Sequence, residues 1–214
     1  MLTVLVAANA CSDAISAPRA KERPGFDIQA LRPEDSRFAW DGPGATNRGS
    51  GDRVATFTVD PNVSRSYTFG PHWIYFPAQS ICDPATSGYG ITLWDVPCAR
   101  LSHPIEVTVN WSNRSGYTVA TFKPQLRFVP AAANSVNHWV ILSLHNVKKL
   151  HELNLYDILY NGGDGWIDES LTDPTLHAWL DPLHNSVVRR IKHFSGYMVA
   201  AANSDMGGFG DASF

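Results

Sequence analysis

The sequence predicts an all-β fold, an antiparallel β-sandwich of immunoglobulin-like architecture with an extended N-terminal tether. Its apolar residues recur in short runs of about five to eight residues, several of which alternate strictly with polar residues, as on a half-buried strand. Turn-forming residues separate these runs roughly every 8–12 residues, which is typical of sandwiches and barrels. With 214 residues, 44% of them hydrophobic, the chain can bury the core that such a fold needs.

The clearest strand pair is a hairpin. Residues 105–111 (IEVTVNW) alternate apolar and polar side chains, 113–116 (NRSG) form the turn, and 118–123 return. The other expected strands are 54–60, 126–129, 139–144, 153–160, 187–194 and 197–201. For 147–155 the pattern is compatible with either a helix or a loop.

An aromatic stretch at 66–77 is expected to form one extended segment. Gly70-Pro71 would kink it, and Pro77 would end it, because proline has no N–H for a strand ladder. The loop that follows is bracketed by Cys82 and Cys98. A disulfide between them would close a loop of about 17 residues, worth roughly 3 kcal/mol in the chain-entropy model. Two free buried thiols are the alternative.

The charge pattern gives no reason to expect nucleic acid or an anionic membrane surface as a partner, since the net charge is −3 and the pI is near 6.2. Charged residues make up 17% of the chain, below the roughly 25% typical of soluble domains. The neutral surface suits an exported protein, and it equally suits a protein partly covered by a partner.

Residues 1–14 resemble the end of a bacterial lipoprotein signal. Small residues, Ala8 and Ala10, precede Cys11, which such signals acylate. The segment departs from the pattern by lacking a basic n-region, and it is shorter than the about 20 apolar residues of a membrane-spanning helix. We therefore expect a location in the cell envelope, on the periplasmic side, with membrane attachment through Cys11.

The body of the chain, 53–201, is expected to be the β-sandwich domain. Residues 15–52 are rich in Pro, Gly and polar residues and predict an extended linker, and 202–214 has the composition of a flexible tail. Spaced aromatic residues in these segments and in the turns after Asn161 can contact the protein's own surface or a partner. These interface candidates are Phe26, Phe38, Trp40, Trp166, Trp179, Phe209 and Phe214.

Four segments carry a resemblance to a known family: HWIYFPAQSICDP, GYGITLWDVPC, LRFVPA and IKHFSGYMV. They resemble bacterial exported proteins with ZU5-like β-sandwich domains, which end in an HFSxY segment. The resemblance covers about residues 53–200 and implies an interaction module rather than an enzyme. Because bacteria associated with this family include phototrophs, it also implies one class of partner, a photosynthetic reaction-centre/light-harvesting complex, for which no individual residue argues.

The same resemblance implies one chemical alternative, because an HFS tripeptide cuts itself in some ZU5-containing proteins. At Phe194-Ser195 the serine hydroxyl would attack the preceding carbonyl, with His193 as proton acceptor. The favoured interpretation is structural: Phe194 packs in the core, Ser195-Gly196 form a turn or bulge, and His193 is a satisfied polar neighbour.

No other motif predicts catalysis, a cofactor or a metal. The sequence contains no HExxH, no G-x-S-x-G elbow, and no glycine-rich loop before a lysine. Residues 161–169 (NGGDGWIDE) lack the spacing of an EF-hand loop and predict a hairpin turn with solvated carboxylates. The three cysteines offer no zinc pattern.

The sequence therefore predicts a non-catalytic binding or structural protein. It would be an accessory subunit or interaction module that docks on, or stabilises, a membrane-associated protein assembly through its tether, tail and neutral face. Self-cleavage at Phe194-Ser195 and carbohydrate binding by exposed tryptophans are the two alternatives.

Overall fold

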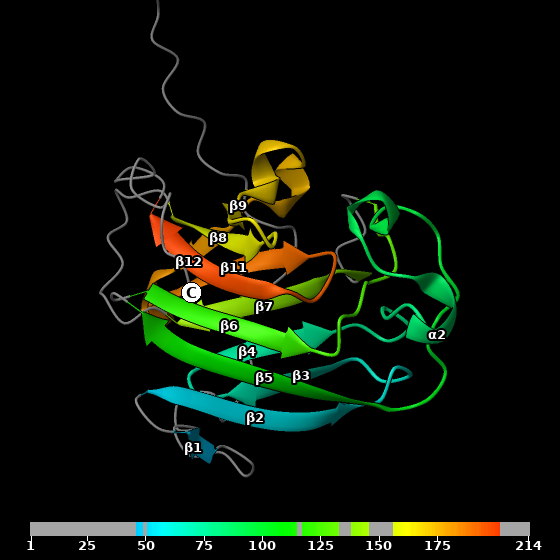
Figure 1. Cartoon of the computed structure of the whole chain (residues 1–214), viewed down its shortest axis with the longest axis horizontal. Coiled ribbons are helices and arrows are strands. Elements are labelled where there is room, and N and C mark those ends of the chain that lie inside the picture. Colours follow the sequence, from blue (N-terminus) through cyan, green and yellow to red (C-terminus); the bar gives the residue numbers. More distant parts are fainter. Residues whose placement is uncertain (1–45, 49–50, 115–116, 133–137, 146–155, 202–214) are drawn as a thin grey trace, which may run out of the picture.

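The computed structural model describes residues 46–48, 51–114, 117–132, 138–145 and 156–201. Within them, two antiparallel sheets pack face to face (Figure 1), which confirms the predicted all-β sandwich. The apolar segment 1–14, most of the linker, the tail and the question of helix or loop at 147–155 lie outside the described residues. So do six of the residues singled out from the sequence: Cys11, Phe26, Phe38, Trp40, Phe209 and Phe214.

The larger sheet has seven strands in the order β1-β2-β5-β6-β12-β8-β9. Their bounds are β1 Thr46–Arg48, β2 Asp52–Val59, β5 Ile105–Arg114, β6 Tyr117–Lys123, β8 Tyr156–Asn161, β9 Trp166–Ile167 and β12 Gly196–Ala201. The short β1 lies inside the range predicted as linker and pairs with the start of β2. The predicted hairpin is present as β5 and β6, with Asn113 opposite Thr118.

The smaller sheet has five strands in the order β10-β11-β7-β4-β3. Their bounds are β3 Arg65–Phe69, β4 His72–Phe76, β7 Val140–His145, β10 Trp179–Asp181 and β11 Ser186–Ile191. In the described part of the chain, the connections contain one α-helical turn, α2 Pro84–Ser87, and the 3-10 turns η3 Ile91–Leu93, η5 Glu169–Leu171, η6 Pro174–Leu176 and η7 Pro182–His184. No helix among the described residues is long and apolar enough to span a membrane.

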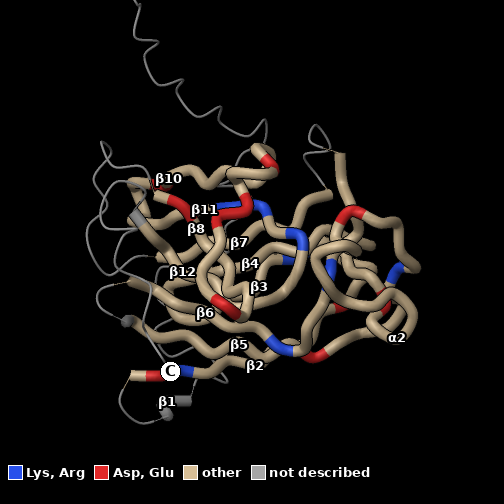
Figure 2. The backbone as a smooth tube through the Cα atoms, turned by 45° about the horizontal axis from the view of Figure 1, so that its top comes forward, with Lys and Arg blue, Asp and Glu red and all other residues tan. Residues whose placement is uncertain are grey.

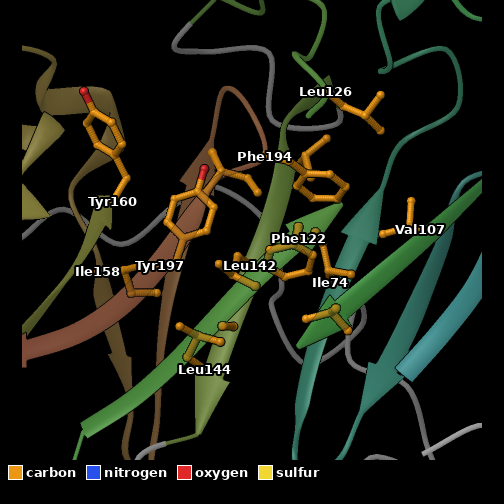
Figure 3. Close-up of a cluster of buried hydrophobic side chains, with 14 of the residues drawn as sticks. Ile74, Val107, Phe122, Leu126, Leu142, Leu144, Ile158, Tyr160, Phe194 and Tyr197 are labelled. Atoms are coloured by element: carbon orange, nitrogen blue, oxygen red, sulfur yellow. The ribbon is translucent and has the colours of Figure 1, made fainter. Parts of the chain in front are cut away.

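The core forms because the alternating strands turn one face inward. In β5, Val107, Val109 and Trp111 are buried, whereas Glu106 is exposed and Thr108 half-buried. Figure 3 shows side chains from both sheets gathered in the space between them, including Ile74, Val107, Phe122, Leu142 and Tyr197. Basic and acidic residues are sparse along both sheets (Figure 2), in agreement with the low content of charged residues in the sequence.

The prediction of a single kinked segment at 66–77 was wrong. β3 and β4 instead pair antiparallel, with Phe69 opposite His72, so the chain reverses direction at Gly70-Pro71. Gly70 has φ 63°, in the left-handed region, which a glycine reaches without the steric penalty of a side chain. The sequence pattern indicated an interruption at Gly70-Pro71, but it did not indicate that the chain reverses direction there.

The expected strand at 126–129 is also wrong, and β11 ends before the predicted limit at 194. Residues 126–128 cross one end of the sandwich, where the backbone N–H of Phe128 donates to Lys192 and the carbonyl of Arg127 accepts from Cys82. Only isolated bridges form there, with Ile81 and His193 as the partners. β11 stops at Ile191 because the chain then passes from the smaller sheet into β12 of the larger one.

Gly70→Ala is expected to lower the free energy of unfolding by about 2 kcal/mol, because it adds backbone strain and a steric contact. A Cβ at this position would lie 3.1 Å from Cζ2 of the buried Trp111. Urea-induced unfolding of the two proteins measures the loss. Gly51→Ala is the matched control, since Gly51 also has a positive φ but its Cβ would meet no atom within 4 Å. Equal losses for both variants would show that the contact with Trp111 contributes nothing.

Candidate functional site

An open groove of about 1100 Å³ lies at one end of the larger sheet, where β6 ends and β12 begins. The outward faces of β5 and β6 supply its polar residues, Glu106, Thr108, Thr121 and Lys123. These side chains alternate with the inward-facing core residues of the same strands, so the groove lies on the solvent side of the sheet. Ser195 and Gly196 also line it, at the start of β12.

Two loops form the walls of this groove. One is the disulfide-closed loop 82–98, which contributes Tyr89, Ile91 and Trp94. This loop contains α2 and lies beside the start of β5 and the end of β6 (Figure 1). The other is the β8–β9 turn, which contributes Asn161 and Ile167. The disulfide loop therefore forms part of an open concave surface.

The walls expose aliphatic side chains to solvent. Six large hydrophobic residues are exposed within the described ranges: Val63, Ile91, Val96, Ile167, Leu171 and Leu183. Three of these, Ile91, Val96 and Ile167, lie on the two segments that contribute the walls, 82–98 and 161–167, and Ile91 and Ile167, which line the groove, are 68% and 43% exposed. Exposed apolar residues gathered beside a groove are typical of a docking surface rather than of a solvated face.

A disulfide and a buried arginine hold the first wall in place. Cys82 and Cys98 are bonded, as the sequence suggested. Arg127, only 3% exposed, donates from Nη1 to the carbonyls of Leu93 and Val96, at 2.7 and 2.6 Å, and from Nε to that of Ser87, at 3.2 Å. The guanidinium thus satisfies carbonyls of a loop that makes few strand-type hydrogen bonds.

A lysine ties the same loop to the segment after β9. Lys192 Nζ lies 2.6 Å from Asp95 Oδ1 and 2.7 Å from Asp173 Oδ2. Burial alone would lower the pKa of Lys192, but its hydrogen bonds to Asp173 and Asp95 raise that pKa above its usual value. Burial alone would raise the pKa of Asp173, but hydrogen bonds from Lys192 and Thr175 hold that pKa below its usual value.

Behind the groove lies a buried cluster of three ionisable residues, Glu169, Arg189 and His193. Arg189 Nη2, on β11, is 2.5 Å from Glu169 Oε2, and His193 Nε2 is 3.2 Å from Glu169 Oε1. Arg189 and His193 are fully buried and Glu169 is 6% exposed. Arg189 also donates from Nη1 to the carbonyl of Ile158 on β8. Charges buried this deeply require such pairing, because unpaired they would carry a large desolvation penalty.

Aromatic residues of the groove pack directly on this cluster. The ring of Trp94 stacks on that of His193, with centroids 3.7 Å apart, and Tyr160 meets the same imidazole edge-on at 5.1 Å. Tyr89 Oη lies 3.2 Å from His193 Nδ1 and donates to the carbonyl oxygen of Phe194. Burial, with a smaller contribution from the Glu169 carboxylate, raises the pKa of Tyr89 to about 12, so this hydroxyl keeps its proton at neutral pH.

The HFS tripeptide lies where the chain passes between the sheets. Phe194 is fully buried and stacks on Phe122, with centroids 4.6 Å apart. Ser195 Oγ lies 3.1 Å from the carbonyl oxygens of Asn161 and Gly196, to which it can donate. Tyr89 thus contacts both His193 and the carbonyl of Phe194, while the hydroxyl of Ser195 bonds to backbone oxygens. Self-cleavage remains a prediction that this arrangement does not test.

The two tryptophans predicted as interface residues are half-buried. Trp166 packs with Leu159 and Met198 on the outward face of the larger sheet. Trp179 packs with Trp73 and Trp139 on the smaller sheet. The structure brings neither of them into the groove lining.

The residues of the buried cluster had no motif in the sequence. Residues 161–169 were expected to carry solvated carboxylates, and Asp164 is exposed, but for Glu169 that expectation was wrong. Asp168 caps η5 by accepting the N–H of Ser170 at 2.8 Å, which turns the next carboxylate inward. The only available signal was Arg189 itself, a charge in the middle of an apolar strand.

No family model, no curated protein and no solved structure matches this chain. Within the described ranges, no group of three or more His, Cys, Asp or Glu side chains lies close enough together to hold a metal ion. The interpretation of the groove and the buried cluster therefore depends on their own geometry.

Asp173→Asn is expected to lower the free energy of unfolding at pH 7 by about 1 kcal/mol, because Lys192 loses a charged partner. Since the pKa of Asp173 is depressed in the folded protein, its stabilising effect is present above the unfolded value, near 3.8, and is lost as pH falls through the folded value. Urea unfolding at pH 7 and at about pH 2 measures this, and the difference between wild type and variant should vanish at the lower pH. Asp95→Asn is the control and should cost less, because Asp95 is 73% exposed. A difference that persists in acid would contradict the ion-pair explanation.

Proposed function

We propose that this protein is a non-catalytic binding module of the bacterial envelope that docks, through the groove, on another protein of a membrane-associated assembly. The observation that carries the proposal is the concentration of exposed aliphatic side chains on the two walls of the groove. Removing such side chains from water drives most protein–protein association. The polar residues on β5 and β6 would supply the hydrogen bonds that fix the orientation of the partner.

The chemistry of the walls favours a polypeptide over a glycan. Sugars bind through exposed, flat aromatic faces, but the exposed apolar residues of the groove are the branched aliphatics Ile91 and Ile167. Trp94, which lines the groove, is 8% exposed, and its ring stacks on His193. Among the described tryptophans none is fully exposed.

The proposed compartment is supported by the disulfide, because such bonds persist in oxidising environments outside the cytoplasm. Attachment to the membrane through Cys11 is part of the same proposal. A photosynthetic reaction-centre/light-harvesting complex is one candidate assembly, supported by the family resemblance alone.

Ile91→Asp is expected to weaken docking at least about 10-fold, because it puts a charge into an apolar contact. Native envelope proteins captured by the tagged wild-type chain would be compared with those captured by the variant. Leu183→Asp is the matched control, since Leu183 is 85% exposed but lies outside the groove. The proposal requires a stoichiometric partner that is lost with Ile91→Asp and retained with Leu183→Asp. Equal recovery with both variants would exclude the groove as the docking site.

Self-cleavage at Phe194-Ser195 is a second candidate, favoured by one contact. The hydroxyl of Tyr89 donates to the carbonyl oxygen of Phe194, the oxygen that would carry negative charge if Ser195 attacked. A donor placed there would stabilise the tetrahedral intermediate of an N-to-O acyl shift.

Denaturing mass spectrometry of the purified chain tests this second candidate. Self-cleavage predicts two fragments from the wild-type protein, intact chain from Ser195→Ala, and slower cleavage in Tyr89→Phe. A single species near 23.5 kDa for the wild-type chain would exclude it.

A further inference from the structure

The hydroxyl of Tyr89 contacts two groups but has only one proton. It donates to the carbonyl oxygen of Phe194, which can only accept, and it lies 3.2 Å from Nδ1 of His193. A phenol that gives its proton to the carbonyl can meet the imidazole only as an acceptor. In this arrangement Nδ1 of His193 must therefore carry a hydrogen.

The other ring nitrogen faces a carboxylate. Nε2 of His193 is 3.2 Å from Oε1 of Glu169, and the second oxygen of that carboxylate is 2.5 Å from Nη2 of Arg189. A carboxylate paired with a guanidinium is an ionised acceptor, so Nε2 must donate as well. The hydrogen-bond pattern thus corresponds to a doubly protonated imidazolium.

Loss of one proton from this imidazolium reverses the direction of the hydrogen bond between Tyr89 and His193. Nε2–H would still donate to Glu169, whereas Nδ1 would become an acceptor of a hydrogen bond donated by the Tyr89 hydroxyl. The carbonyl of Phe194 would then lose its donor. Because Phe194 is fully buried, that loss is costly and favours a shift of the Tyr89 side chain.

We propose that His193 is a proton-operated switch for the wall of the groove. When His193 is protonated, Tyr89 is fixed at two points, to His193 and to the carbonyl of Phe194. When His193 is neutral, Tyr89 bonds to His193 alone. Tyr89 and Trp94 both line the groove and contact the imidazole directly, so docking would depend on pH. This last consequence rests on the function proposed above.

The hydroxyl groups that surround His193 keep their own protons. Burial raises the pKa values of Tyr89, Tyr160 and Tyr197, so these hydroxyls remain donors. Glu169 and Arg189 form an ion pair with each other. The titratable and charged groups around the imidazole are Glu169 from η5, Arg189 from β11, Tyr160 from β8, Tyr197 from β12, Tyr89 from the disulfide loop and Arg127, which bridges to His193 through its backbone.

Nuclear magnetic resonance of the free, isotopically labelled chain tests the switch between about pH 5 and pH 9. The expected result is that Nδ1 of His193 changes from protonated to unprotonated as pH rises. The carbonyl ¹³C signal of Phe194 should shift with the same midpoint, as it loses its hydrogen bond. In Tyr89→Phe, which keeps the ring but removes the hydroxyl, the carbonyl signal should no longer follow His193.

Two outcomes would overturn the proposal. One is a His193 side chain that keeps the same protonation state over the whole pH range. The other is a Phe194 carbonyl signal that is unaffected by His193, or that follows it equally well in Tyr89→Phe. Because no partner is present, a negative result leaves docking at the groove standing, and a failure to find a docking partner leaves the switch standing.

Discussion

The ion pair between Arg189 and Glu169 is the interaction on which the buried cluster behind the groove depends. Arg189 belongs to the smaller sheet, Glu169 follows β9 at the edge of the larger one, and the same guanidinium reaches the carbonyl of Ile158 in β8. Removing the Glu169 carboxylate would leave the Arg189 guanidinium buried without its charged partner, which costs about 3–5 kcal/mol in comparable cases. The pair also holds Glu169 against His193, so the imidazole and the aromatic wall stacked on it take their positions from this contact.

Most of the fold could be predicted from the sequence because strand signals are local. The alternation in β5 and β6 and the turn residues between them specify a hairpin without reference to the rest of the chain. The disulfide was predictable for a similar reason, since Cys82 and Cys98 bracket one short loop. The reversal of the chain at Gly70 was not predictable, because a glycine followed by proline can either kink a strand or turn it back on itself.

The candidate site could not be predicted because its parts are distant along the chain. Tyr89 and His193 are 104 residues apart, and they meet only because the chain changes sheets between β11 and β12. No periodicity in a short window encodes such a crossing. Glu169 was mistaken for a solvated residue because it lies in a glycine-rich turn sequence, and only the position of Arg189 in the fold reveals why it is buried. The HFS tripeptide lies beside this cluster, but nothing in the sequence indicated the tyrosine that contacts it.

β12 is the last of the described strands along the sequence, yet it occupies an inner position of the larger sheet, between β6 and β8. A chain that emerges from the ribosome with its N-terminus first would therefore present two unpaired strand edges, on β6 and β8, until β12 has been made. The larger sheet therefore cannot be completed by adding strands in sequence order. Pairings between strands that are distant along the chain also favour slow folding. We expect truncations that reach into β12 to abolish folding, because they leave β6 and β8 without the strand that lies between them.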